Sequence, residues 1–217
     1  MAASSSPIIV LIILLYVNSS ACSPFNKIYA FGDSFTDTGN TQTGTGPTSF
    51  THVSNPPYGV TFFKHPTNRY SDGRLVIDFV AQALSLPFLP PYKHVKGVPP
   101  QGVNFAVAGS TAINHAFFEK NNLTLDVTPE SIETQLAWFD SFLQRQGCYG
   151  SVSSTPACAS ALGDALIWVG EIGVNDYAYA VGSSITTETV RNLGIRSVSR
   201  FLKVKPWWCR ACCLRVA

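Results

Sequence analysis

A glycine–aspartate–serine triplet stands directly after a short apolar segment near the N-terminus. Residues 27–31 read KIYAF, and Gly32, Asp33 and Ser34 follow at once. Serine is one of the residue types that forms covalent acyl intermediates when its hydroxyl attacks a carbonyl carbon. The same triplet can be an ordinary turn, so Ser34 is a candidate nucleophile only if other segments bring matching groups to it.

Two further motifs also follow apolar segments. Gly109 comes after segment 102–108, and Gly173-Val174-Asn175-Asp176 comes shortly after segment 165–169. Taken singly, Gly109 could be a tight corner, and an Asn-Asp pair often caps a helix or forms an Asx turn. In a parallel sheet, however, active sites form in the loops outside the carboxyl ends of the strands. The shared position of the three motifs at that edge indicates one site.

The elements that would position these motifs alternate along the chain. Three apolar segments are predicted as strands, at residues 27–31, 102–108 and 165–169. Three segments with helical apolar spacing are predicted as helices, at Ser71–Ser85, from Thr128 to Gly147, and at Thr187–Leu202. Residues 36–70 are rich in Gly, Thr, Pro and Asn and are predicted as a long irregular loop. Alternating strands and helices predict an α/β fold with a parallel sheet covered on both faces.

Four sequence blocks, in order, resemble those of the GDSL esterase/lipase family, also called SGNH hydrolases, and of its plant secreted branch. The blocks are FGDSFTDTGN at 31–40, RYSDGR at 69–74, NFAVAGS at 104–110 and GVND at 173–176. Phe35 stands where the family has Leu, which leaves the nucleophile position unchanged. The resemblance runs from about residue 27 to about residue 202.

The resemblance implies a fold and a set of roles. The fold would be a three-layer α/β sandwich with a parallel, flavodoxin-like sheet, of which the C-terminal part is missing here. Ser34 would be the nucleophile, and its backbone N–H, the Gly109 N–H and the Asn175 amide would form the oxyanion hole. Asp33 and Asp37 would hold the nucleophile loop. The chemistry needs no metal and no cofactor.

The general base that the family pattern requires is absent from this sequence. The family places it, with its orienting aspartate, in an Asp-x-x-His block near the C-terminus. The four histidines are His52, His65, His94 and His115, and none lies in such a block. Residues 203–217 contain two adjacent Trp and three Cys and do not resemble the family. We therefore expect a truncated product with residues 23–202 as the N-terminal part of the hydrolase domain and 203–217 as an aberrant tail.

Several features predict a secreted protein, extracellular or in the cell wall. The apolar run 8–17 followed by small residues predicts a signal peptide over 1–22, and it is too short to span a membrane. Asn122 lies in a glycosylation sequon. Cys148 and Cys158 could close a disulfide in an oxidising compartment, with two free thiols as the alternative.

The amino-acid composition limits the classes of partner that this protein is expected to bind. The net charge of +2 and the lack of a Lys/Arg cluster argue against a nucleic-acid partner, while 46% apolar and 13% charged residues favour a folded core. The expected substrate is a small-molecule ester, an acyl lipid or an acetylated carbohydrate. The alternative is a non-catalytic secreted form that binds acyl or carbohydrate ligands.

Overall fold

The computed structural model describes residues 25–42, 48–123, 128–149 and 155–203. The predicted signal peptide, Thr124 of the sequon and residues 204–217 of the predicted tail lie outside these ranges. In chain order the elements are β1 (Lys27–Phe31), the 3-10 helix η1 (Thr48–Ser54), α2 (Val76–Ala83), the 3-10 helix η2 (Tyr92–His94), β2 (Gly102–Asn104), α3 (His115–Lys120), α4 (Ile132–Gln144), α5 (Pro156–Leu162), β3 (Ala165–Val169), α6 (Val174–Ala180) and α7 (Thr187–Lys203).

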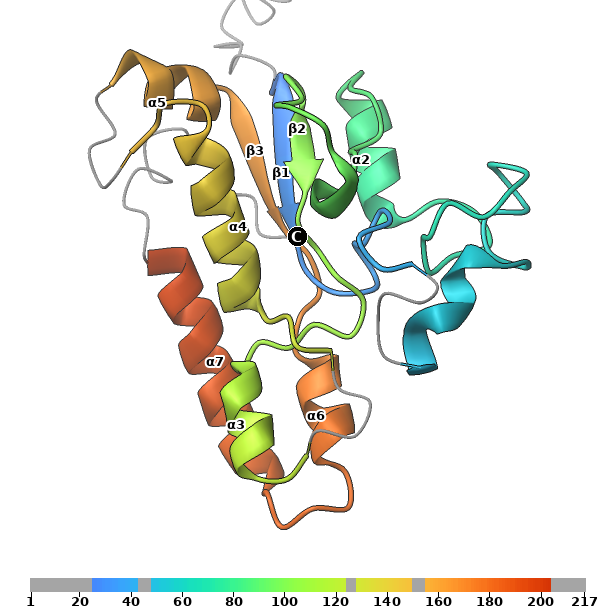
Figure 1. The fold of residues 1–217 in the computed structure, drawn as a ribbon, viewed down its shortest axis with the longest axis vertical. Coiled ribbons are helices and arrows are strands. Elements are labelled where there is room, and N and C mark those ends of the chain that lie inside the picture. The colour runs from blue at the N-terminus through green and yellow to red at the C-terminus, as the bar shows by residue number, and fades with distance from the viewer. Residues whose placement is uncertain (1–24, 43–47, 124–127, 150–154, 204–217) are drawn as a thin grey trace, which may run out of the picture.

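The sheet is parallel, with β1 in the middle, and the order β2-β1-β3 (Figure 1). Ile28 pairs with Gly102 of β2 and with Leu166 of β3. The two strands predicted at 27–31 and 165–169 have the bounds expected from the sequence. The prediction of an α/β fold with a parallel sheet is therefore confirmed.

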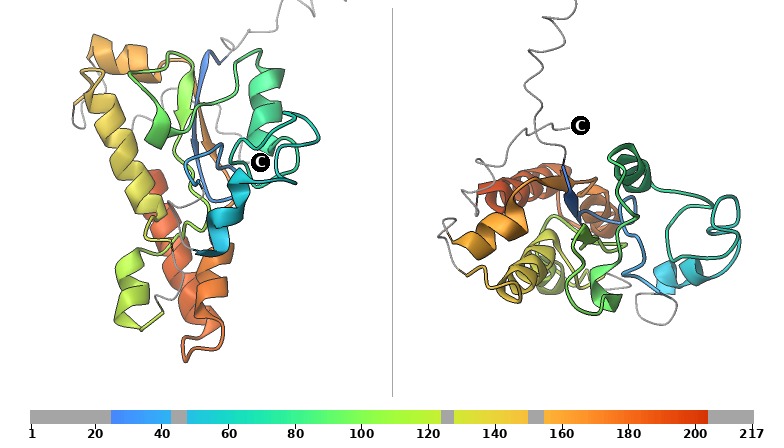
Figure 2. Two further views of the ribbon diagram at one scale, coloured as in Figure 1. Left: turned by 45° about the vertical axis from the view of Figure 1, so that its right-hand side comes forward. Right: turned by 90° about the horizontal axis from the view of Figure 1, so that it is seen from above.

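Helices cover both faces of the sheet. Successive side chains of β1 therefore point into two different cores. Tyr29 and Phe31 face an aromatic core with Phe105, Phe139 and Phe201. A second core on the other face gathers Ile28 and Ala30 with side chains from α2 and its flanking loops. Seen from above, α4, α5 and α7 lie on one side of the strands and α2 on the other (Figure 2). Burial on both faces explains why β1 is a continuous apolar run instead of an alternating pattern.

The helix predicted from Ser71 begins only at Val76. The Ser71 hydroxyl accepts a hydrogen bond from the Gly73 N–H (3.0 Å), so it serves a turn instead of a helix cap. Asp78 takes the capping role, since its carboxylate accepts the Leu75 N–H at 2.9 Å. The capping signal was present in the sequence but was assigned to the wrong polar residue.

The strand predicted to run to Ala108 ends at Asn104. The Asn104 side chain donates to the Thr36 carbonyl at 2.6 Å and accepts from the Ala106 N–H at 2.9 Å, while the Phe105 N–H still donates to the Ala30 carbonyl of β1 at 2.7 Å. The helix predicted from Thr128 starts at Ile132, because the buried Thr128 hydroxyl donates to the Ala108 carbonyl (3.0 Å) instead of capping. In both places a tertiary contact replaces the expected local one.

Three short helices, α3, α5 and α6, occupy segments in which no helix was predicted. Each has six or seven residues, too few to show a clear apolar period. A disulfide joins Cys148, just after α4, to Cys158 in α5, with the two Cα atoms 4.6 Å apart. Within the described ranges, no helix has both the length and the apolar character needed to cross a membrane.

Candidate active site

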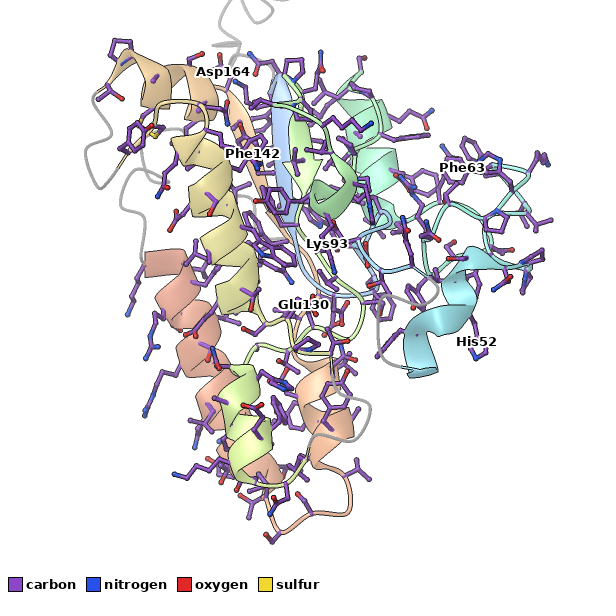
Figure 3. The ribbon with its side chains drawn as sticks, viewed as in Figure 1. His52, Phe63, Lys93, Glu130, Phe142 and Asp164 are labelled. Carbon is purple, nitrogen blue, oxygen red and sulfur yellow. A yellow bond between two sulfur atoms is a disulfide. The ribbon has the colours of Figure 1, made fainter. Side chains whose placement is uncertain are left out.

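The three motifs singled out in the sequence meet at the carboxyl ends of the strands. Ser34 lies in the turn after β1, Gly109 lies in the loop after β2, and Asn175 lies in the first turn of α6 after β3. Figure 3 labels Lys93 and Glu130, whose ion pair (3.4 Å) joins the segments before β2 and before α4 near this end of the sheet.

A tight helical turn carries Ser34. The N–H groups of Thr36 and Asp37 both donate to the Asp33 carbonyl, at 3.0 and 2.9 Å. This turn leaves Ser34 partly exposed and Phe35 64% exposed, while Asp33 is fully buried. Ser34 is thus the accessible polar residue of this turn, beside the exposed Phe35.

Asp37 is the buried anchor of the nucleophile loop. One carboxylate oxygen accepts the N–H groups of Gly39 (2.8 Å) and Asn40 (2.6 Å), and the other accepts those of Thr41 (3.1 Å) and Ala108 (2.9 Å). Burial raises the pKa of this carboxyl, while these hydrogen bonds favour its charged form. Because Ala108 precedes Gly109, the Asp37 side chain fixes the 31–40 block against the 104–110 block.

Gly109 cannot be replaced without moving its surroundings. Its φ is +79°, and a Cβ at this position would lie 2.4 Å from the Thr128 hydroxyl and 2.6 Å from the Phe50 ring. The Tyr179 hydroxyl donates to the Gly109 carbonyl at 2.9 Å. The glycine is therefore required by its own packing, and not only by the close approach of a substrate.

The side-chain amide of Asn175 connects the 31–40 block with the 104–110 block. The Nδ2 atom donates to the Asp33 carboxylate and to the Ser110 carbonyl, both at 2.9 Å. Both amide hydrogens are thus used by protein acceptors in this structure. Asp176, the next residue, accepts the N–H groups of Ala112 and Ile113 at 2.8 Å each, so α6 is also bound to the segment just after the 104–110 block.

Asp33 shares its environment with a second carboxyl group. Burial, and then a hydrogen bond with the Glu171 side chain, raise the pKa of Asp33 to about 8. Glu171 also caps α6, since its carboxylate accepts the Val174 N–H at 3.2 Å. Burial and the neighbouring Glu171 thus favour the protonated form of Asp33.

The pKa of Asp33 predicts a pH-dependent stability. The carboxyl has a pKa of 3.8 when unperturbed and about 8 in the folded chain, so between these values the folded state holds a proton that the unfolded state has lost. The stabilising contribution is full below pH ~4 and is lost as pH rises through ~8, with a slope of at most ~1.4 kcal/mol per pH unit for one proton. Buried Asp37 and Asp176 have raised pKa values and act in the same direction.

Urea unfolding of the chain across this pH range measures the slope. Glu171→Gln should flatten it, because the glutamine amide would donate to the Asp33 carboxylate and lower the Asp33 pKa. The exposed Glu188, which pairs with Arg191 on α7, supplies the control Glu188→Gln. Equal slopes in wild type and Glu171→Gln would show that the carboxyl pair does not set the dependence.

None of the four histidines belongs to the three motifs that meet at this site. His52, His65 and His94 are exposed, and Figure 3 shows His52 at the outer edge of η1. His115 starts α3 and approaches Glu119 at 3.7 Å. Among the described residues, no group of three or more His, Cys, Asp or Glu side chains could hold a metal ion.

Two polar side chains that the sequence analysis left out reach this site. Glu171 contacts Asp33, and Gln135 contacts Gly32 and Ser110. A signal for Gln135 was available, since it falls between Ile132 and Phe139 at helical spacing, on the buried face of α4. A polar residue inside an apolar stripe needs hydrogen-bond partners when it is buried.

The serine after β1, the glycine loop after β2 and the asparagine of α6 thus lie at one edge of the parallel sheet of an α/β fold. The chain belongs to the GDSL-like Lipase/Acylhydrolase family, whose model matches residues 28–200.

Relatives in plants share this stretch. The chain is 58% identical over 187 residues to the GDSL esterase/lipase At3g48460 of Arabidopsis thaliana, covering 83% of this chain and 47% of the relative. It is 44% identical over 167 residues to the Arabidopsis GDSL esterase/lipase At1g28590, covering 76% of this chain and 40% of that one. It is 42% identical over 177 residues to a sinapine esterase of Brassica napus, covering 77% and 42%. The chain thus spans less than half the length of these curated relatives.

Proposed function

We propose that this chain supplies the nucleophile and the oxyanion-binding groups of a secreted serine hydrolase that cleaves carboxylic esters of small molecules. The observation that carries the proposal is the pair of hydrogen bonds from Asn175 to Asp33 and Ser110. These bonds connect the segments that follow all three strands, and Asp33 is adjacent to Ser34 in the chain. Family membership over residues 28–200 supports the same assignment.

In the proposed mechanism the Ser34 hydroxyl attacks the ester carbonyl carbon while a general base takes its proton. The carbonyl oxygen becomes negatively charged and is held by the N–H groups of Ser34 and Gly109 and by the Asn175 amide. Such donors contribute most when they are fixed before the reaction. The tetrahedral intermediate expels the alcohol with a proton returned by the base, and water then releases the acid from the acyl-serine.

Asn175 has to exchange one partner during this cycle, because both of its amide hydrogens already have acceptors. The bond given up is the one to the neutral Ser110 carbonyl or the one to the Asp33 carboxyl, whose pKa is raised by burial. Hydrogen bonds to a neutral acceptor are roughly half as strong as those to a charged one. A developing oxyanion therefore competes well for this donor.

The family pattern assigns the base to the histidine of an Asp-x-x-His block, and the printed sequence contains no such block. The proposed ester hydrolase activity is therefore best tested in two proteins. One is the 217-residue chain itself. The other is a chimera in which residues 1–202 are joined to the part of At3g48460 that follows the matched stretch on its C-terminal side.

Both proteins are treated with a fluorophosphonate that carries a reporter, and the labelled peptide is identified by mass spectrometry. We expect the chimera to carry the adduct on Ser34 and to hydrolyse short-chain p-nitrophenyl esters. Sinapine, an acyl lipid and an acetylated carbohydrate complete the substrate set. An adduct on a different serine would contradict the assignment. Ligand binding without turnover in both proteins would favour the non-catalytic alternative.

We also propose that the protein is secreted and carries a glycan on Asn122. This residue is exposed just after α3, with φ +56°. The expected result is a secreted protein that begins near Cys22 and loses mass on treatment with an N-glycosidase. Asn122→Gln should abolish the mass loss, whereas Asn121→Gln, next to the sequon, should not. Secreted material with an intact Met1 would contradict the predicted signal peptide.

A further inference from the structure

Gln135 is a fully buried amide in the first half of α4, on the face that packs against the sheet. Its neighbours on this face, Ile132 and Phe139, belong to the aromatic and aliphatic core. A buried amide costs a few kcal/mol unless its donors and acceptor are all paired. A leucine would serve packing alone at this position, so the amide calls for a different explanation.

The amide forms a two-point pair with the backbone of Gly32. Gln135 Oε1 accepts the Gly32 N–H at 3.0 Å, and Gln135 Nε2 donates to the Gly32 carbonyl at 2.7 Å. The second hydrogen of Nε2 is directed to the Ser110 hydroxyl at 3.1 Å. The oxygen and both hydrogens of the Gln135 amide are thus all hydrogen-bonded, to Gly32 and to Ser110.

These two residues lie beside the groups that the mechanism needs. Gly32 is two positions before Ser34, and Ser110 follows Gly109. Gly32 has φ +145°, and a Cβ there would lie 3.0 Å from the Glu171 carbonyl oxygen. A side chain would therefore be strained at this position. The amide of Gln135 therefore sets the distance between the loop of the nucleophile and the loop of the second oxyanion donor.

Asn175 closes the connection on the other side. It binds Asp33, next to Gly32, and the carbonyl of Ser110. Gln135 and Asn175 thus bracket the two loops from opposite elements, α4 and α6. In the first loop Gln135 holds the Gly32 backbone and Asn175 holds the Asp33 side chain. In the second loop Gln135 holds the Ser110 hydroxyl and Asn175 holds the Ser110 carbonyl.

We propose that Gln135 is a positioning residue for the oxyanion hole, which fixes the Ser34 and Gly109 N–H groups relative to each other without touching the substrate. The proposal rests on the ester hydrolase function proposed above. Displacement of a reacting group by about 1 Å can cost ~10²-fold in rate. Loss of the amide should therefore lower kcat more than it raises KM.

The test uses Gln135→Leu and Gln135→Glu in the chimera, with p-nitrophenyl butyrate as the substrate. Gln144→Leu on the exposed end of the same helix is the matched control, and Ser34→Ala reports whether the measured activity belongs to this site. Circular dichroism and thermal melts establish that each variant is folded at the assay temperature. The chain itself is measured in parallel wherever it shows turnover.

We expect Gln135→Leu to reduce kcat by ~10–100-fold with KM changed less than ~3-fold, since only the transition-state geometry is disturbed. Gln135→Glu should recover toward wild type as pH falls, because a protonated carboxyl can again donate to the Gly32 carbonyl while a charged one repels it. The rates are taken as a ratio to wild type at the same pH. If Gln135→Leu does not fold, the pH-dependent recovery of Gln135→Glu decides the question.

The outcomes separate this proposal from the one on which it rests. A Ser34→Ala variant that keeps full activity would overturn the proposed function. A Ser34→Ala variant without activity, beside a folded Gln135→Leu variant that matches Gln144→Leu in kcat, would overturn the positioning role alone. A pH-independent ratio for Gln135→Glu would do the same, since a purely packing role does not depend on protonation.

Discussion

Ser34→Ala in the chimera is expected to reduce kcat for p-nitrophenyl butyrate by ~10⁴–10⁶-fold, because the variant lacks the atom that forms the acyl bond. The residual rate would come from substrate binding and the oxyanion donors. Substrate binding itself should change little, since the hydroxyl is small and lies in a turn beside the exposed Phe35. Steady-state kinetics and fluorophosphonate labelling give the two readouts, and both should fall together.

Ser141, an exposed serine on α4 whose hydroxyl donates only to the carbonyl of its own helix, provides the matched control Ser141→Ala. This variant should keep wild-type kinetics. An Ser34→Ala variant that retains more than about a tenth of wild-type kcat would exclude Ser34 as the nucleophile. The same result would require another nucleophile or an attacking water at this edge of the sheet.

Asn175→Ala is expected to slow kcat by ~10²–10³-fold, which is the usual effect of losing one oxyanion donor. Asn175→Asp should be at least as slow, because a carboxylate in the same volume offers no hydrogen to an oxyanion. The alanine variant also loses the bonds to Asp33 and Ser110, so its melting temperature has to be measured with its kinetics.

Asn192→Ala, on the exposed face of α7, is the control, because its amide contacts only Glu188 among the hydrogen bonds described. A loss confined to KM in Asn175→Ala would assign the amide to ground-state binding and not to the transition state. A wild-type kcat in a folded Asn175→Ala variant would remove the residue from the oxyanion hole.

The parts of the fold that followed from the sequence are those in which local composition and burial agree. β1 and β3 are continuous apolar runs whose side chains contribute to both cores, β1 largely buried and β3 partly buried, and their bounds were predicted correctly. The meeting of Ser34, Gly109 and Asn175 at one edge followed from the geometry of parallel strands. α7, with seventeen residues, was long enough to show its helical period.

The rest depended on contacts between distant segments. Ser71 and Thr128 are of residue types that often cap helices. In the structure, however, the Ser71 hydroxyl takes part in a turn and the Thr128 hydroxyl donates to the Ala108 carbonyl. The bond that Gln135 makes to Gly32 joins residues 103 positions apart, and no local pattern indicates such a partner. The pairing of Asp33 with Glu171 was hidden for the same reason, although both lie next to predicted motifs.

The central strand of this sheet is also the first one to be synthesised. β1 pairs with β2 through Gly102 and with β3 through Ala165, so neither neighbour exists when Lys27–Phe31 leaves the ribosome. At roughly 5–20 residues per second, translation needs on the order of 10 seconds to reach β3. During that time an apolar segment with unpaired backbone groups travels with the nascent chain. The order of strands therefore delays the pairing of β1 with β3 until more than a hundred further residues have been synthesised.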